Sequence, residues 1–236
     1  LIIENEMVGT VLSTDDGQVA AAAAASSSGG GKKKKASSIQ QQQQSNEANV
    51  FGFASIINLT INSSSPTIQS LKSTCLKYCP SQYRSEMTTV LSGSTARPAG
   101  FFFMERMVNV PLEITDVLHD QLVLDMEYAV MSADDDVERK SLDFGAFVRL
   151  APCYKSGNGS GGGGNGAGNN VIYKYFDDEV FATNSEFTYN FEVPKLYKSD
   201  TDNGNGEEDN MRCGVIVMTK TGHRRALKEL KKMIHG

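Results

Sequence analysis

Residues 214–219 read GVIVMT, and residues 221–234, just beyond them, read TGHRRALKELKKMI. The first stretch is apolar throughout, which is typical of a strand buried on both faces of a sheet. The second repeats apolar residues every three or four positions with bases between them, which predicts an amphipathic helix. We expect Thr221 to cap that helix. A doubly covered strand that leads into a helix predicts a sheet with helices packed on it.

Further strands are predicted along the chain. In residues 187–193, Phe187, Tyr189 and Phe191 alternate with polar residues, so one face of that strand should be buried and the other wet. Short runs of β-branched and aromatic residues predict strands at residues 7–13, 51–60, 101–104, 144–150 and 171–176.

Helices are expected at residues 66–79, at residues 82–91 and from Pro111 onward. In the long helix that Pro111 opens, the apolar residues predicted to form one buried face are Ile114, Val117, Leu118, Leu122 and Met126. Helices that interrupt six or seven strands favour a mixed α/β (α+β) fold, with a central β-sheet flanked by helices. A pure Rossmann alternation does not fit this order.

Low-complexity stretches divide the chain without splitting its core. They predict a single domain over residues 1–236, with disordered insertions at about 18–47, 156–170 and 198–210. The basic run at residues 32–35 is either a nuclear-localisation patch or a solvated low-complexity segment.

Composition narrows the class of protein. The 236 residues carry 23 Lys+Arg and 28 Asp+Glu, a net charge of −5, so direct sequence-specific nucleic-acid binding is not expected and basic protein partners are favoured. No apolar stretch approaches the ~18 residues of a membrane span. The four cysteines are interpreted as buried free thiols, and a zinc site at Cys75 and Cys79 is the weaker alternative.

Acidic clusters are the candidate partner-binding residues. They comprise Asp134, Asp135, Asp136, Asp177, Asp178, Glu179, Glu207, Glu208 and Asp209. Consecutive acids on a strand or turn point to different sides, so we expect residues 177–179 to form a solvated hairpin end and not a convergent acid–base or metal site. Residues 171–211 carry a net charge of −7 and residues 212–236 carry +6. That segregation indicates either a bipolar surface or only the wet face of the last helix.

Candidates for catalysis are few. The three histidines are His119, His223 and His235, and no serine elbow, HExxH or Walker pattern accompanies them. His223 lies on the apolar stripe of the last helix, where a packed side chain is the simpler interpretation. We therefore expect a protein that is not an enzyme and that uses no cofactor or metal.

Five ordered blocks carry a resemblance to a known family. They are VGTVLSTDD from Val8, VFGFASIINLT from Val50, GFFFMERMVNVPLEI from Gly100, VIYKYFDDEVF from Val171 and FTYNFEV from Phe187. In this order they resemble the BCCIP family of nuclear, CDK-inhibitor-binding proteins and chaperones. Its most specific marks here are FGFASIINLT and Glu105-Arg106-x-x-Asn109-x-Pro111. We expect Glu105 and Arg106 to organise a strand-to-helix corner through hydrogen bonds, with partner contact as the alternative.

The resemblance implies a fold similar to the GNAT acetyltransferases, without their activity. Their coenzyme loop carries Q/R-x-x-G-x-G/A, whereas Gly222 is the single glycine at the matching strand-to-helix junction. The resemblance also implies a non-catalytic nuclear adaptor or chaperone that escorts a basic large-subunit ribosomal protein in ribosome biogenesis and nuclear transport. Such a protein would shuttle to the cytoplasm with nuclear export machinery. The alternatives are a cell-cycle or DNA-repair scaffold that binds a CDK inhibitor or recombination regulator, and an acetyl-CoA-dependent N-acetyltransferase.

Overall fold

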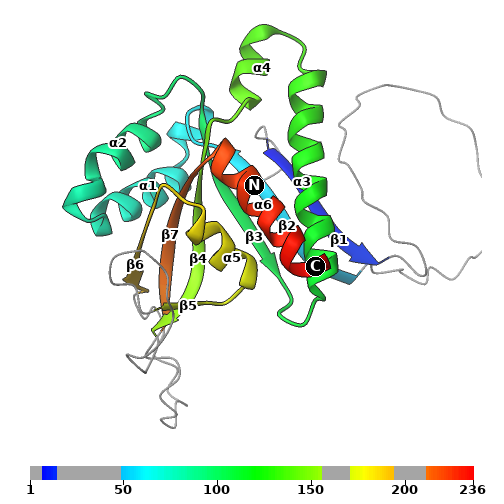
Figure 1. The fold of residues 1–236 in the computed structure, drawn as a ribbon. Helices are drawn as coiled ribbons and strands as arrows, with labels where there is room; N and C mark the ends of the chain where they lie inside the picture. Colours follow the sequence, from blue (N-terminus) through cyan, green and yellow to red (C-terminus); the bar gives the residue numbers. More distant parts are fainter. Residues whose placement is uncertain (1–6, 15–48, 156–170, 194–210) are drawn as a thin grey trace, which may run out of the picture.

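The computed structural model describes residues 7–14, 49–155, 171–193 and 211–236 (Figure 1). The elements in chain order are β1 (Met7–Thr14), β2 (Asn49–Asn58), α1 (Pro66–Tyr78), α2 (Arg84–Ser92), β3 (Ala99–Arg106), α3 (Leu112–Ser132), α4 (Asp136–Leu142), β4 (Ala146–Lys155), β5 (Val171–Tyr173), α5 (Phe176–Thr183), β6 (Phe187–Glu192), β7 (Met211–Thr219) and α6 (Lys220–His235). The insertions predicted at about 18–47, 156–170 and 198–210 lie outside the described residues, as does the basic run at 32–35.

The strands form one mixed sheet, as predicted. Six of its seven strands follow the order β1-β2-β3-β4-β7-β6, and β5 pairs with β4. β3 and β4 are parallel, and the other described pairs are antiparallel. The chain between β3 and β4 forms α3 and α4, the helical crossover that a parallel pair requires.

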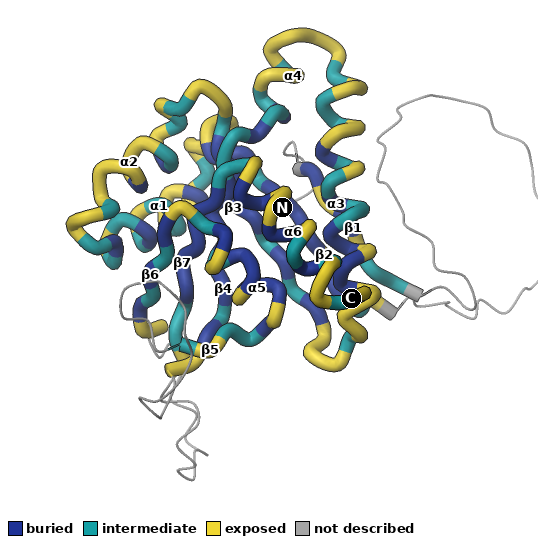
Figure 2. The backbone as a smooth tube through the Cα atoms, viewed as in Figure 1, coloured by how far each residue is buried: buried dark blue, intermediate teal, exposed yellow. Residues whose placement is uncertain are grey.

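Helices cover both faces of the sheet. α3, α5 and α6 enclose one hydrophobic core, and α1 and α2 enclose the other (Figure 1). Successive residues of β7 supply both cores, since Val215 and Val217 belong to one and Ile216 and Met218 to the other. The predicted doubly buried strand is therefore confirmed, and Figure 2 shows β3, β4 and β7 as largely buried.

The period-two prediction for β6 is also confirmed. Phe187, Tyr189 and Phe191 are buried and belong to the core beneath α1 and α2. Phe191 stacks on Tyr78 and Phe187 stacks on Tyr83, with ring centroids 4.4 and 4.7 Å apart. This edge strand is thus tied to the α1–α2 layer by two aromatic pairs.

The start of α6 differs from the prediction. Thr219, not Thr221, is the N-cap, and its hydroxyl accepts a hydrogen bond from the backbone N–H of Gly222 at 3.1 Å. A Cβ on Gly222 would meet the carbonyl oxygen of Asn184 at 2.8 Å. Gly222 is therefore required for close packing between α5 and α6.

The buried face of α3 also differs from the prediction. Leu118, Leu122 and Met126 are buried as expected, but Ile114 and Val117 are exposed. The positions of the helix that face the sheet include His119 and Asp116, which are buried through polar contacts. The prediction considered apolar residues alone, so it left out His119 and Asp116 and placed Ile114 and Val117 on the buried face instead.

The predicted strand at residues 171–176 is wrong beyond Tyr173. β5 has three residues, and Phe176 begins the helix α5. Asp177, Asp178 and Glu179 occupy the first turn of that helix. Their negative charges stabilise the helix by interacting with its positively polarised N-terminus.

The cysteines behave as expected of free thiols. Cys75, Cys79 and Cys153 are buried, Cys213 is only partly buried, and no described cysteine forms a disulfide. Burial raises the pKa of Cys75 and of Cys153 to about 12, so both thiols stay protonated near neutral pH. None of the described helices has the length and apolarity to cross a membrane.

Candidate functional site

A buried ionic cluster joins α5 to two strands and to α3. Asp177 accepts hydrogen bonds from Arg106 at 2.6 Å on one oxygen, and its other oxygen lies 2.9 Å from Nε2 of His119. Asp178 accepts two hydrogen bonds from Arg149, at 2.9 and 3.1 Å. All five side chains are at most 3% exposed.

This cluster corrects the expectation for residues 177–179. Asp177 and Asp178 are fully buried in a helix, so the predicted solvated hairpin end is wrong, and neither side chain is accessible to a partner in this structure. The helix turns both carboxylates inward while Glu179 stays exposed, and two guanidinium groups from β3 and β4 receive them. The expectation that these carboxylates would point to different sides failed because the local element is a helix and not a turn.

Electrostatics explains why these charges remain inside. Burial alone would raise the pKa of Asp177, but the hydrogen bond and charge of His119, together with Arg106, lower it to about 2. Burial raises the pKa of Asp178, while the bidentate contact with Arg149 favours the charged form. Among the described residues, no group of three His, Cys, Asp or Glu side chains could hold a metal ion.

The corner at Glu105 and Arg106 is organised by hydrogen bonds, as expected. Glu105 pairs with Lys174 at 2.5 Å and accepts a hydrogen bond from the hydroxyl of Tyr175. The same hydroxyl lies 2.7 Å from the carbonyl oxygen of Arg106, and the Arg106 guanidinium lies 4.4 Å from the centre of the Tyr175 ring. The two family-marking residues thus bind the end of β3 to the segment between β5 and α5.

Sequence reasoning missed Arg149, His119 and Lys174 as members of this network. Arg149 left a readable signal, because it is the one charged residue in the otherwise apolar run FVRLA. A lone guanidinium in a buried strand needs a buried counter-charge, and that requirement points to an acid elsewhere in the chain. His119 gave no such signal, since its partner lies 58 residues away.

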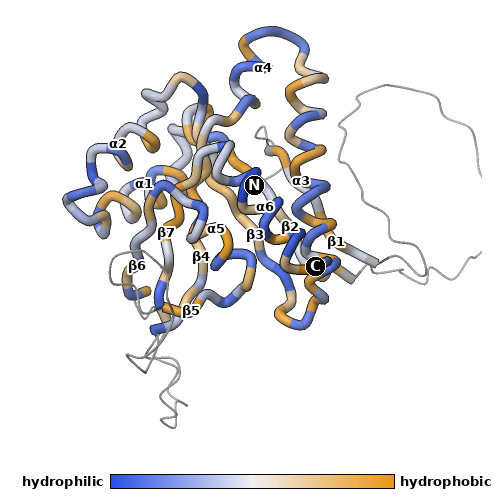
Figure 3. The backbone as a smooth tube through the Cα atoms, in the orientation of Figure 1, coloured by the Kyte–Doolittle hydropathy of each residue, from blue (hydrophilic) through white to orange (hydrophobic). Residues whose placement is uncertain are grey.

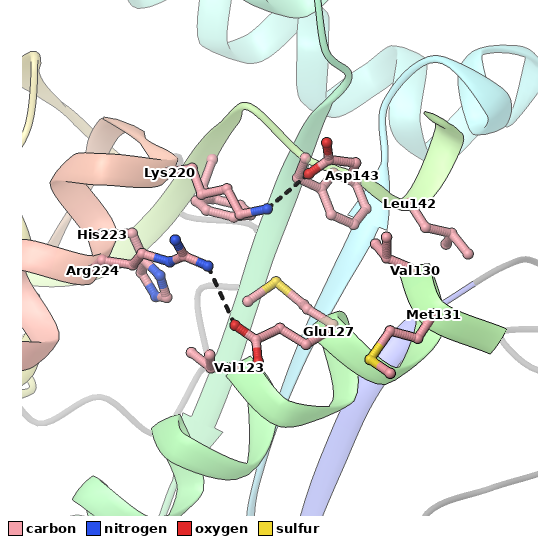
Figure 4. Close-up of a pocket in the computed structure, with 12 residues that line it drawn as sticks. Val123, Glu127, Val130, Met131, Leu142, Asp143, Lys220, His223 and Arg224 are labelled. Atoms are coloured by element: carbon pink, nitrogen blue, oxygen red, sulfur yellow. Dashed lines mark hydrogen bonds and ion pairs between the residues drawn. The ribbon is translucent and has the colours of Figure 1, made fainter. Parts of the chain in front are cut away.

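A second feature is a pocket of about 260 Å³ between α3, α6 and the segment after α4 (Figure 4). Its apolar lining includes Val123, Met126, Val130, Leu142, Phe144 and Phe147. At its mouth, Arg224 pairs with Glu127 at 3.3 Å and Lys220 pairs with Asp143 at 2.8 Å. A lining of this kind accepts an apolar group, since an apolar cavity of about 150 Å³ already binds benzene.

His223 lies in the wall of this pocket and is buried, as predicted for a packed histidine. Its ring stacks on Phe181 at 5.6 Å and meets the edge of Phe102 at 5.8 Å. Its Nε2 atom has no hydrogen-bond partner. Burial, with smaller contributions from His119 and Arg224, lowers the pKa of His223 to about 3, so the ring is neutral near pH 7.

A third feature is the outer face of α3 with α4, which we call the α3–α4 surface. Its exposed apolar residues are Val117, Leu124, Tyr128, Met131 and Val137, each more than half exposed. Hydrophobic segments recur along the length of α3 in Figure 3, consistent with apolar residues on both its inner and outer sides. Asp134, Asp135 and Asp136 lie exposed at the turn between the two helices.

The predicted acidic residues that the structure describes are therefore not brought together into one site. Asp134, Asp135 and Asp136 border the α3–α4 surface, and their role in partner binding stays a prediction. Glu179 is exposed on α5, beside the two buried aspartates. Glu207, Glu208 and Asp209 lie outside the described residues.

The architecture defines a class before any relative is considered: a three-layer α/β domain built on a mixed, mostly antiparallel sheet. The chain belongs to the BCCIP family, because the family model described as BCCIP matches residues 1–186. The resemblance drawn from the sequence blocks is thereby confirmed.

Individual relatives agree with this assignment. The chain is 36% identical over 80 residues to the bovine "BRCA2 and CDKN1A-interacting protein". That match covers 33% of this chain and 26% of the relative. It is 24% identical over 161 residues to the Drosophila melanogaster "Protein BCCIP homolog", covering 67% of this chain and 49% of the relative. The matches thus span at most about half of these relatives' length.

A solved structure shares the fold. The crystal structure of BCP1 from Saccharomyces cerevisiae superposes with a TM-score of 0.53 and 13% identity, over 82% of this chain and 70% of that one. This likeness establishes the mixed sheet flanked by helices as a known arrangement. The expected likeness to GNAT acetyltransferases stays a prediction.

Proposed function

We propose that this chain is a non-catalytic nuclear adaptor that escorts a basic protein of the large ribosomal subunit during subunit assembly and transport. Membership of the BCCIP family supports a partner-binding role, because the names of its mammalian members state that they interact with other proteins. The inference that the client is basic rests on one observation, the acidic charge of α3 and α4.

Residues 112–143 contain ten acids and two bases. Four of the acids, namely Asp116, Asp120, Glu127 and Asp143, pair with residues of α6. The other six outnumber Arg139 and Lys140 by four charges, on a surface that also exposes apolar side chains. Such a surface attracts a basic polypeptide and competes with RNA for its lysines and arginines.

The test is recovery of the client from the source cells. The tagged chain is purified at moderate salt and the proteins that accompany it are identified by mass spectrometry. We expect one basic large-subunit ribosomal protein in stoichiometric amount, with binding that weakens steeply as salt rises. Affinity that hardly changes with salt, or the absence of any ribosomal protein, would contradict the proposal.

A second function is favoured by the relatives' names. Bovine, mouse and human relatives are named for interaction with BRCA2 and CDKN1A, which suggests a scaffold for a recombination regulator or CDK inhibitor. Cell-cycle proteins recovered without a ribosomal protein in the same purification would favour this scaffold. Reciprocal pull-downs with the identified partner would then establish it.

The acyl-CoA transferase alternative receives no support from the residues at its predicted site. The N–H of Gly222 is engaged by the hydroxyl of Thr219, and the space above its Cα is filled by the Asn184 carbonyl. Gly222 therefore serves helix packing. Calorimetric titration with coenzyme A tests the alternative directly, and saturable heat at that junction would revive it.

A further inference from the structure

The outer side of α3 is an apolar helix face that no described element covers. Leu118, Leu122 and Met126 turn toward the sheet, whereas Val117, Leu124, Tyr128 and Met131 are 58%, 57%, 67% and 82% exposed. At 100° per residue, these four residues share a narrow stripe on the side opposite the buried one. The stripe runs about 21 Å along the helix axis, from Val117 to Met131.

A stripe of this length and spacing fits another helix. Apolar anchors at helical spacing are what a helix-in-groove contact uses. The stripe also continues into the pocket, because Met131 is both exposed and part of the pocket lining. A docked helix could therefore place one large apolar side chain between α3 and α6.

The charges beside the stripe select the occupant. α3 contains five acids and no base. Asp120 and Glu127 meet Lys231 and Arg224 on the side of α6, so their charge is balanced within the molecule. Glu113, Asp125 and Asp134 form no ion pair with the described residues of α6 and add negative charge, and the next bases along the chain are Arg139 and Lys140 of α4, where Arg139 pairs with Asp136. A partner helix with lysine or arginine beside its apolar stripe is complementary to this side, whereas an acidic helix is repelled.

We propose that the α3–α4 surface docks an amphipathic helix of a partner protein whose apolar stripe is flanked by lysine and arginine. This proposal rests on the proposed function for the basic nature of the partner. It goes further in naming the surface, the secondary structure of the bound segment and its anchoring on Leu124 and Tyr128.

The experiment uses the full chain and a fluorescein-labelled peptide of about 18 residues. The peptide is helical, with leucines at every third or fourth position and lysines or arginines beside them. A control peptide has the same leucines but carries glutamates in place of the lysines and arginines. Fluorescence anisotropy should show saturable binding of the basic peptide that weakens as salt rises from about 50 to about 500 mM, and no binding of the acidic one.

Variants locate the site. Leu124→Ala with Tyr128→Ala should reduce affinity about tenfold or more, because exposed apolar anchors dominate such contacts while alanine preserves the helix. The matched control removes two exposed apolar side chains elsewhere, by Ile172→Ala with Met211→Ala, and should leave affinity unchanged. Asp125→Lys with Asp134→Lys should weaken binding several-fold, whereas Glu86→Lys with Glu179→Lys should not.

Several results would overturn the proposal. These are absence of peptide binding, equal binding to the Leu124/Tyr128 variant, or equal binding of the acidic peptide. Concentration-dependent dimerisation that the Leu124/Tyr128 variant abolishes would assign the surface to a second copy of this chain. Binding that arises only after deletion of residues 18–47 would assign it to the chain's own sequence.

The outcome is separable from that of the proposed function. If the Leu124/Tyr128 variant still captures the ribosomal protein from cells, the docking surface is wrong and the escort role stands. If no basic client is captured by any variant while the peptide binds as expected, the docking surface stands and the escort role fails.

Discussion

Two runs of acidic residues in this chain have nearly the same local sequence and opposite surroundings. Residues 134–136 are DDD and lie exposed at the turn between α3 and α4. Residues 177–179 are DDE, and the first two are fully buried against Arg106, His119 and Arg149. The difference is made by residues 29 to 71 positions away in sequence, and not by the runs themselves. Acid content alone therefore does not identify a binding surface.

The largest expected effect comes from removing a buried carboxylate. Asp177→Ala leaves Arg106 and His119 without their counter-charge, which should lower the free energy of unfolding by about 3–5 kcal/mol. The measurement is urea denaturation followed by circular dichroism. Asp134→Ala is the matched control and should change stability by no more than about 0.5 kcal/mol. Equal effects of the two substitutions would remove the contrast between the runs.

The second pair tests whether burial of charge is itself stabilising. Arg149→Met and Asp178→Leu should each cost about 3–5 kcal/mol, because each strands a buried charge. The double variant should recover most of that loss, since an apolar pair carries no desolvation penalty. A double-mutant cycle by urea denaturation measures the recovery, and simple additivity of the two losses would contradict it.

The free energy of unfolding should depend on pH mainly through the protonation of His223, which is buried near His119 of the ionic cluster. Its pKa is lowered from 6.5 to about 3, so the unfolded chain binds the proton more readily than the folded one. The stability it contributes is complete above pH 6.5 and is lost as pH falls toward 3. The contribution of Asp177, whose pKa is also lowered, disappears later, between pH 3.8 and about 2.

His223→Phe isolates this contribution. Phenylalanine preserves the ring contacts with Phe181 and Phe102 and does not titrate, so the loss of stability between pH 6.5 and 4 should flatten. Urea denaturation at intervals across that range measures the slope. His235→Gln, at an exposed histidine near the end of α6, is the control. An unchanged slope in the His223 variant would show that another group sets it.

Burial that depends on a local repeat could be predicted from the sequence, whereas burial that depends on distant partners could not. The alternation in β6 and the apolar run in β7 report burial directly, because each residue's side is set by a local period of two. The apolar stripe of α6 was predicted for the same kind of reason: Ala226, Leu227 and Leu230 are buried, whereas Met233, near the end of the helix, is exposed. These local patterns gave most of the sheet and helices correctly.

The polar interior was not predictable in the same way. The sequence around Asp177 is compatible with a turn or a helix, and its burial depends on partners from distant elements, namely Arg106 on β3 and His119 on α3. Asp116 and His119 on α3 were overlooked because a search for apolar periodicity passes over polar residues that tertiary contacts bury. The same search also failed to predict the exposed apolar stripe on α3, because it assigned Ile114 and Val117 to the core.

The smallest effect compares two neighbours within the exposed run. Asp135 is the N-cap of α4, and its carboxylate accepts hydrogen bonds from the N–H groups of Val137 and Glu138, both at 2.8 Å. Asp135→Ala should therefore cost about 1 kcal/mol, whereas Asp134→Ala should cost little. Hydrogen exchange of the α4 amides measures this locally, because loss of the cap should speed exchange at Val137 and Glu138 first. If both substitutions speed it equally, the run acts on α4 through its charge alone, and the capping geometry contributes nothing.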